Sequence, residues 1–174
     1  YLMTGVAMSL ATLWGASAAM ADVEVAVVGP VTGQVAALGE QAVQGAKRAV
    51  EDINAAGGIN GEKLVLEIGD DGCDPKQAVS VANQMASKEV KFVAGHLCSG
   101  ASIPASKVYE DEGVLMISPA STNPKLTDEG GWNVARVCGR DDAQGQVAGD
   151  YIAKAYAGKK VAISEQTEAP QKGK

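Results

Sequence analysis

Residues 90–102 read Val-Lys-Phe-Val-Ala-Gly-His-Leu-Cys-Ser-Gly-Ala-Ser, a short apolar run followed by small, mostly polar residues. Such a run is typical of a buried parallel strand whose carboxyl end faces a ligand. Ser99 offers a hydroxyl group, and a helix that opens after Gly100 would offer unpaired backbone N–H groups beside it. Hydroxyl and N–H groups together can bind an anion without Arg or Lys. We therefore predict one half of a binding site for the carboxylate of an amino acid.

A second polar cluster, Ser118-Pro-Ala-Ser-Thr122, follows the next apolar run. If both runs are parallel strands, their carboxyl ends meet at one edge of the sheet. A Ser or Thr after a strand is often only a helix cap, which is the alternative interpretation for Ser99, Ser121 and Thr122. The convergence of the two clusters at adjoining strand ends favours ligand binding.

His96 is the only histidine in the chain. As a catalytic base it would need a nucleophile and an orienting carboxylate, for which Ser99 and Asp70 are the candidates. A hydrogen-bonded structural histidine is the favoured interpretation. The G-x-S-x-G elbow of α/β hydrolases is absent, since the nearest stretch reads Ser99-Gly-Ala-Ser. We predict that the chain is not an enzyme, and a small α/β hydrolase is the alternative from a different class.

Metal, cofactor and nucleic-acid sites are not predicted. A single His and three Cys without a Cys-x-x-Cys pair disfavour zinc. The adjacent acids Asp70 and Asp71 point to opposite faces of an extended chain, so a turn or cap role is favoured over calcium binding. The Gly29–Gly33 stretch lacks the G-x-G-x-x-G spacing of dinucleotide sites. The net charge of −6 over 174 residues argues against a nucleic-acid partner.

Cys73 and Cys98 each follow a predicted strand and would lie at the same edge of a parallel sheet. A secreted chain permits a disulfide between them, which would stabilise the fold by roughly 3–4 kcal/mol. Two free buried thiols are the alternative. Cys138 is left over and is interpreted as a small buried apolar residue rather than a nucleophile.

Apolar periodicity predicts alternating strands and helices from residue 23 onward. The strands are expected at 23–29, 63–68, 90–95, 114–117, 132–137 and 160–164, and the helices at 39–55, 74–88, 104–112 and 142–156. Asp74 before Pro75 is typical of a helix N-terminus. Strand–helix units in series predict an α/β fold, a parallel sheet with helices on both faces. Ligands of such sheets bind beyond the carboxyl ends of the strands.

Residues 1–21 carry no charge and end in Ala19-Met-Ala. This pattern predicts a secretory signal peptide with an A-x-A cleavage site. A membrane-spanning helix is the alternative, because an uncharged run of this length could just cross a bilayer. The chain has no Met at position 1 and no basic region before the apolar run, so we expect a truncated start.

Several longer motifs resemble the periplasmic leucine/isoleucine/valine-binding proteins of amino-acid ABC importers. The motifs are Asp71-Gly-Cys-Asp-Pro-Lys-Gln-Ala, Gly95-His-Leu-Cys-Ser, Tyr109-Glu-Asp-Glu-Gly and Ser118-Pro-Ala-Ser-Thr-Asn-Pro, and the similarity extends over about residues 23–163. The resemblance implies a type I periplasmic-binding-protein lobe, an amino-acid ligand, a membrane permease as partner and a periplasmic location. It also implies a monomer that closes around its ligand by hinge motion and carries no cofactor.

The resemblance assigns roles to particular residues. Ser99 matches the serine that binds the ligand carboxylate, Thr122 the threonine that contacts carboxylate and ammonium, and Ala120 the residue whose carbonyl accepts from the ammonium. The predicted ligand-binding residues are Leu38, Leu97, Cys98, Ser99, Ala120, Ser121 and Thr122. The resemblance also implies the Cys73–Cys98 disulfide, and it places Leu38 where leucine-binding members carry an aromatic wall residue.

The resemblance further predicts a signal peptide over residues 1–21, an N-terminal lobe over 22–138 and the beginning of a second lobe over 139–174. In the family the second lobe continues further and the chain then returns to complete the first lobe. We therefore expect this chain alone to bind weakly, unless it is a fragment of a longer product. The family's aromatic residue after the first strand of the second lobe falls near Pro170 here. Because neither Leu38 nor the segment near Pro170 supplies the aromatic residue of leucine-binding members, another amino acid, an amide and urea are alternative ligands.

Overall fold

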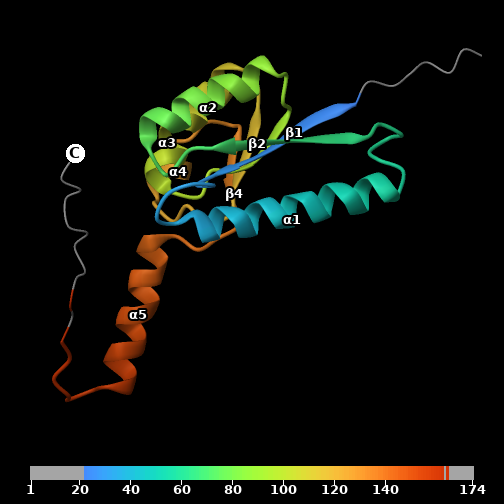
Figure 1. Ribbon diagram of the computed structural model, residues 1–174. Helices are drawn as coiled ribbons and strands as arrows, with labels where there is room; N and C mark the ends of the chain where they lie inside the picture. Colours follow the sequence, from blue (N-terminus) through green and yellow to red (C-terminus); the bar gives the residue numbers. More distant parts are fainter. Residues whose placement is uncertain (1–21, 163, 165–174) are drawn as a thin grey trace, which may run out of the picture.

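The computed structural model describes residues 22–162 and residue 164. At its centre lies a sheet of five strands in the order β2-β1-β3-β4-β5, all parallel (Figure 1). The strands are β1 (Val23–Gly29), β2 (Leu64–Asp70), β3 (Phe92–Gly95), β4 (Leu115–Ser118) and β5 (Val134–Arg136). Because the strands are parallel, all their carboxyl ends lie at one edge of the sheet.

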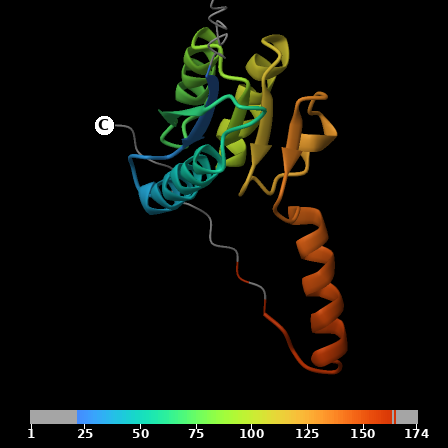
Figure 2. The ribbon, with the colours of Figure 1, turned by 90° about the vertical axis from the view of Figure 1, so that its right-hand side faces the viewer.

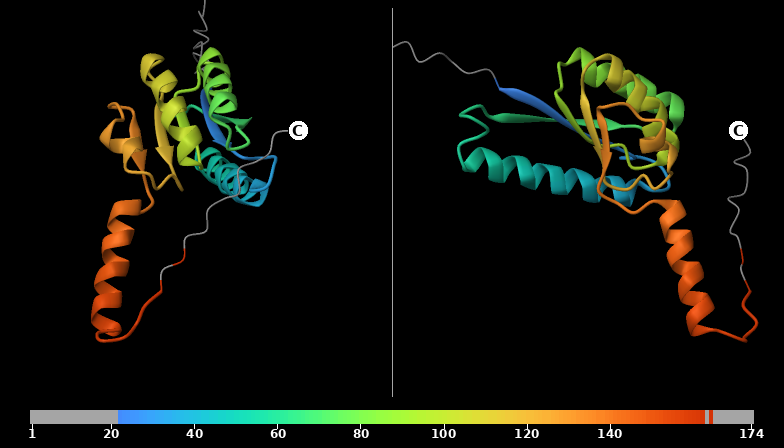
Figure 3. Two further views of the ribbon diagram at one scale, coloured as in Figure 1. Left: turned by 90° about the vertical axis from the view of Figure 1, so that its left-hand side faces the viewer. Right: turned by 180° about the vertical axis from the view of Figure 1, so that it is seen from behind.

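Helices cover both faces of this sheet (Figure 2, Figure 3). The helices are α1 (Ala36–Ala55), α2 (Pro75–Ser87), α3 (Ser99–Asp111), α4 (Lys125–Asp128) and α5 (Asp141–Ala155). Helix α1 packs against β1 and β2 on one face, whereas α2 and α3 pack side by side on the other. Helix α5 extends away from the sheet and buries none of its residues. The predicted α/β fold with helices on both faces is confirmed.

The main hydrophobic core lies between the sheet and the layer formed by α2 and α3. Ala78 and Ala82 on α2, and Ala101 and Ala105 on α3, have no exposed surface. Their small side chains allow the helices to approach the sheet and each other closely. The larger fully buried side chains of this core are Val28, Val90, Val93, Tyr109, Met116 and Leu126. This packing places the first turn of α3 directly beyond the end of β3.

The predicted N-terminus of α2 is confirmed. The Asp74 carboxylate accepts hydrogen bonds from the backbone N–H groups of Lys76 (2.9 Å) and Gln77 (2.8 Å). Pro75 occupies the first helical turn, where its missing N–H costs no hydrogen bond. The Gln77 side chain then donates to the Asp70 carbonyl at 2.7 Å, which joins the start of α2 to the end of β2.

Helix α3 begins earlier than the apolar pattern predicted. The apolar pattern indicated a helix over 104–112, and the prediction for Ser99 assumed one that opens after Gly100. The helix begins at Ser99, because the Cys98 carbonyl accepts from the N–H groups of Ala101 and Ser102, both at 2.9 Å. Pro104 lies inside the helix. The pattern was misleading because the first turn contains Ser and Gly rather than periodic apolar residues. Ser99 consequently belongs to the first helical turn.

The prediction of a strand at 160–164 is wrong for the described part of that segment. Residues 160–162 and 164 are not in a strand, and Val161 is 46% exposed with no neighbouring strand beside it among the residues described. The signal peptide predicted for residues 1–21 lies outside the described residues, as do residues 163 and 165–174. Within the described residues, no helix is both long enough and apolar enough to cross a membrane.

Candidate ligand-binding site

The two predicted polar clusters lie side by side at the carboxyl edge of the sheet. Ser99 follows β3 as the first residue of α3, and Thr122 lies in the loop after β4. The backbone N–H of Asn123 donates to the Ser99 hydroxyl oxygen at 3.2 Å, which joins the loop to the helix. Ser99 and Thr122 are both half-buried, so neither is sealed in the core. The predicted convergence of the clusters is confirmed.

This edge carries several hydrogen-bond donors without partners. Among the hydrogen bonds of the described residues, none engages the N–H groups of Ser99 and Gly100, which are the first two of α3. Thr122 uses only its carbonyl, which accepts from the N–H of Asp141 at 3.0 Å. Its own N–H and hydroxyl therefore have no partner there. We call Ser99, Gly100 and Thr122 the anion site, because free N–H groups at a helix N-terminus attract negative charge.

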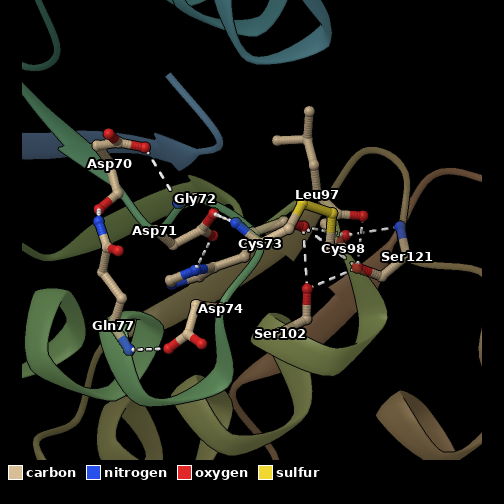
Figure 4. Close-up of polar contacts among 12 residues, drawn as sticks. Asp70, Asp71, Gly72, Cys73, Asp74, Gln77, Leu97, Cys98, Ser102 and Ser121 are labelled. Carbon is tan, nitrogen blue, oxygen red and sulfur yellow. Dashed lines mark hydrogen bonds and ion pairs between the residues drawn. A yellow bond between two sulfur atoms is a disulfide. The ribbon is translucent and has the colours of Figure 1, made fainter. Parts of the chain in front are cut away.

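A cluster of buried serines next to the anion site joins the two turns that carry it. Ser118 donates its hydroxyl to the His96 carbonyl at 2.6 Å, and Ser121 donates to the Leu97 carbonyl at 3.0 Å. The hydroxyls of Ser102 and Ser121 lie 2.5 Å apart (Figure 4). All three serines have no exposed surface. These bonds hold the turn after β3 against the turn after β4.

The side chain of Ser121, one of the predicted ligand-binding residues, is buried. Its side chain has no exposed surface, and its hydroxyl is already bonded to the backbone after β3. Its N–H donates to the Ser118 hydroxyl at 3.0 Å. Ser121 is therefore unable to reach a ligand with its side chain and instead supports the neighbouring Thr122.

His96 is a structural residue, as the favoured interpretation held. Its ring is fully buried, with Nδ1 at 2.6 Å from Asp71 Oδ2 and Nε2 at 3.1 Å from the Tyr109 hydroxyl. The carboxylate partner is Asp71 and not the Asp70 considered from sequence. Burial, reinforced by the charge of Asp71, raises the pKa of the Tyr109 phenol, so the phenol stays protonated. Both ring nitrogens are engaged, and Ser99 is not among their partners.

The disulfide between Cys73 and Cys98 is present, with a Cα–Cα distance of 5.5 Å. It joins the turn after β2 to the start of α3 (Figure 4). Asp71 accepts from the Cys73 N–H at 2.8 Å, so the same turn is bound to the buried histidine pair. Cys138 is free and half-buried, and its thiol lies 3.3 Å from the Ser121 carbonyl.

Asp70 orders the loop between β1 and α1. Its carboxylate accepts from the N–H groups of Val31 (2.9 Å) and Gly72 (3.0 Å) and from the hydroxyl of Thr32 (2.5 Å). Partial burial acts to raise the pKa of Asp70, but the hydrogen bonds from Thr32, Gly72 and Val31 prevail and lower it. Asp70 thus has the predicted turn role, and no cluster of possible metal ligands occurs within the described residues.

The remaining predicted residues border the same edge. Leu97 is 8% exposed and packs on Gly29, where an added Cβ would lie 2.6 Å from Leu97 Cδ1. Ala120 is exposed in the loop that carries the anion site. Leu38 is 54% exposed on the first turn of α1, which follows the carboxyl end of β1. Of these residues, Leu38 and Ala120 are exposed, whereas Leu97 is buried.

Residues 22–171 match a family of periplasmic binding proteins. The chain belongs to the periplasmic binding protein family. It is 52% identical over 162 residues to "Leu/Ile/Val-binding protein homolog 1" of Brucella abortus (strain 2308), covering 93% of this chain and 43% of that protein. It is 52% identical over 159 residues to the "Amino acid binding protein" of Pseudomonas aeruginosa, covering 90% and 42%. This periplasmic binding protein chain thus spans less than half the length of these curated relatives.

Solved structures agree with this assignment. The branched-chain amino acid transporter substrate-binding protein of Streptococcus pneumoniae, in complex with isoleucine, matches with a TM-score of 0.71 and 30% identity over 76% of this chain and 38% of that one. A substrate-binding protein of Desulfitobacterium hafniense in complex with Leu matches with a TM-score of 0.66 and 32% identity, over 77% and 39%. The predicted type I periplasmic-binding-protein fold and the sequence resemblance are confirmed.

Some residues that shape the site of this periplasmic binding protein were missed from sequence. The supporting roles of Ser102 and Ser118 were not predicted, although Ser118 was named in the second polar cluster, because nothing distinguishes a buried serine from an exposed one before the fold is known. Arg136 was also missed, although it is the only charged residue in the apolar segment 132–137. A lone arginine in a predicted strand was the signal that could have found it.

Proposed function

We propose that this chain is the N-terminal ligand-binding lobe, residues 22–138, with the beginning of a second lobe at 139–174, of a solute-binding protein of an ABC importer. Its ligand on this proposal is a branched-chain or related aliphatic amino acid. The observation that carries the proposal is the anion site, where Ser99 and Thr122 are joined through the Asn123 N–H and leave free donors beside them. The printed names of the relatives, which are amino-acid-binding proteins, support the ligand class.

The anion site would bind the ligand through its two charged ends. The carboxylate would accept from the Ser99 hydroxyl and from the N–H groups of Ser99, Gly100 and Thr122. Hydrogen bonds to a charged group contribute about 1.5–3 kcal/mol each, roughly twice those between neutral groups. The ammonium would donate to the Ala120 carbonyl and the Thr122 hydroxyl. Binding and release need no bond to be made or broken, so no catalytic residue is assigned.

The ligand side chain would lie against Leu97, Cys98 and Leu38, which are apolar and border the same edge. Leu38 is aliphatic and exposed, so this wall would make dispersion contacts with an alkyl chain. The partner would be the membrane permease of the importer, reached by a monomer in the periplasm. Membership of the periplasmic binding protein family supports that location.

Isothermal titration calorimetry of the whole polypeptide that the gene encodes, with L-leucine, tests the proposal. We expect saturable 1:1 binding that Ser99→Ala weakens by about ten- to a hundredfold, the size of a lost hydrogen bond to a charged group. Ser80→Ala is the matched control, because Ser80 is exposed on α2 and is not one of the residues of the anion site. Absence of leucine binding, or equal affinity of Ser99→Ala and Ser80→Ala, refutes the proposal.

The alternative ligands are separated in the same titration. Leucinamide keeps the ammonium and the side chain but lacks the carboxylate, whereas acetamide and urea lack both charged ends. A carboxylate-binding site is expected to prefer leucine over leucinamide and to show no heat with acetamide or urea. Preference for an amide or urea would assign the chain to another ligand class within the same fold.

A further inference from the structure

Arg136 on β5 binds the loop that carries Thr122. Its Nη1 donates to the Ser121 carbonyl at 2.8 Å, and its Nη2 donates to the Asn123 carbonyl at 2.8 Å. Nη2 also lies 2.8 Å from the hydroxyl of Thr127 and 3.3 Å from the Pro124 carbonyl. A planar guanidinium can bind two such carbonyls at once, which a lysine ammonium cannot match. The carbonyls on either side of Thr122 are therefore fixed by one side chain.

These bonds determine where the Thr122 N–H points. In a trans peptide the carbonyl of one residue and the N–H of the next point in opposite directions. Because the Ser121 carbonyl faces Arg136, the Thr122 N–H faces away from the guanidinium. The next N–H, that of Asn123, donates to Ser99 across the anion site. The Thr122 carbonyl is in turn bound by the N–H of Asp141, so Thr122 has one backbone orientation.

Arg136 has no carboxylate partner. None of the ion pairs among the described residues involves it, and all its acceptors are carbonyl or hydroxyl oxygens. Arg140 offers the contrast, since it pairs with Asp128 at 2.5 Å and with Asp142 at 2.8 Å. The positive charge of Arg136 therefore lies beside the anion site without a carboxylate of the described residues in direct contact. A cation on a peptide carbonyl also polarises that peptide and strengthens its N–H as a donor.

We propose that Arg136 is a positioning residue of the anion site, which orders the Ser121–Pro124 segment and polarises the Ser121–Thr122 peptide so that the Thr122 N–H binds the ligand carboxylate. This inference rests on the proposed function for its ligand, but its effect on the loop exists without ligand. Arg136 touches no ligand itself. It acts through the backbone on either side of Thr122.

The ligand-free arm of the test measures backbone order by the ¹H–¹⁵N heteronuclear NOE in the whole polypeptide. Arg136→Met is expected to lower the NOE of residues 121–123 while the amides of β1 keep their values. Arg140→Met is the matched control, because it removes the same charge nearby without touching this loop, and it should leave residues 121–123 unchanged. An unchanged loop in Arg136→Met overturns the inference, whatever the ligand is.

The ligand arm measures the ratio of the leucinamide Kd to the leucine Kd. Arg136→Met should lower this ratio about tenfold, since it weakens a donor to the carboxylate that leucinamide lacks. A variant that is merely less stable binds both ligands equally less well, so an unchanged ratio overturns the inference. Failure of the unaltered protein to bind leucine would refute the proposed function and leave the NOE arm to decide the role of Arg136.

Arg136→Lys separates order from charge, and it serves where Arg136→Met does not fold. Lysine keeps the positive charge but presents a single point donor in place of the planar fork. We expect Arg136→Lys to retain part of the ratio of the leucinamide Kd to the leucine Kd. Residues 121–123 should be less ordered in this variant than in the unaltered protein. Full recovery of both the ratio and the NOE values by lysine would overturn the claim that the fork positions the loop.

Discussion

Tyr109→Phe is expected to lower the free energy of unfolding, because it removes one buried hydrogen-bond donor. Nδ1 of His96 lies 2.6 Å from an Asp71 carboxylate oxygen, and because a carboxylate only accepts, Nδ1 carries the proton of this hydrogen bond. The other nitrogen, Nε2, then accepts from the Tyr109 hydroxyl at 3.1 Å. Phenylalanine fills nearly the same volume but leaves Nε2 without a donor in a site from which water is excluded. His96, Asp71 and Tyr109 all have no exposed surface.

The size of the effect follows from the burial of that nitrogen. A buried acceptor left unsatisfied costs about 1–3 kcal/mol. With a urea m-value of about 2 kcal/mol/M, a loss of about 2 kcal/mol lowers the urea midpoint by about 1 M. Urea unfolding followed by far-UV circular dichroism measures the shift. The far-UV signal reports the helices around the core, and an unchanged m-value would show that only stability has changed.

Tyr151→Phe is the matched control. Tyr151 is 64% exposed on α5, so the loss of its hydroxyl exposes no unsatisfied group. We expect its urea midpoint to stay within about 0.3 M of the unaltered protein, since surface substitutions change stability by less than about 0.5 kcal/mol. Equal midpoints for Tyr109→Phe and Tyr151→Phe would refute the assignment of a buried donor–acceptor chain.

Two further predictions concern the loop between β1 and α1. Hydrogen bonds lower the pKa of Asp70 below its ordinary value of 3.8. The ionised carboxylate therefore stabilises the folded state at pH values above 3.8, and this stabilisation is lost as the pH falls through the pKa of the folded state. Between about pH 5 and about pH 3 the urea midpoint should therefore fall more in the unaltered protein than in Asp70→Asn, and parallel pH profiles would contradict this. Gly39→Ala should lower the thermal midpoint, because its Cβ would collide with the Pro30 carbonyl oxygen. Gly45 lies on the same helix with open space around it, so Gly45→Ala should raise the free energy of unfolding by about 0.5–1 kcal/mol. Equal effects of the two alanines, measured by calorimetry, would show that α1 shifts freely against the loop.

The anion site is composed mainly of backbone groups held by buried side chains. The serine cluster fixes the turn after β3, the Cys73–Cys98 disulfide fixes the start of α3, and Arg136 fixes the loop after β4. None of these supports needs to touch a ligand. Substitutions in the supports should therefore change affinity for the carboxylate without changing which ligand side chain is preferred, whereas substitutions at Leu38 or Leu97 should do the reverse.

The order of strands and helices could be predicted from the sequence because it depends on local patterns. The buried run Val23–Gly29 became β1 with the predicted bounds, and Asp74 with Pro75 marked the start of α2. Parallel strands with helical crossovers then required the two polar clusters to meet at one edge. Ser99 and Thr122 followed from that argument, and the family resemblance pointed to the same residues.

Only the tertiary structure decided which polar groups keep free donors at the edge of the sheet and which are internal supports. Ser121 and Thr122 are adjacent and chemically similar, yet one is fully buried and the other keeps a free N–H and hydroxyl. The partner of His96 is Asp71 rather than its neighbour Asp70 for the same reason. Sequence patterns specify which way a strand or helix runs and where it ends, because those depend on neighbouring residues. The direction of a side chain in a turn depends on bonds to residues far away in the chain, such as those from Arg136 to the loop after β4, and these exist only once the sheet has formed.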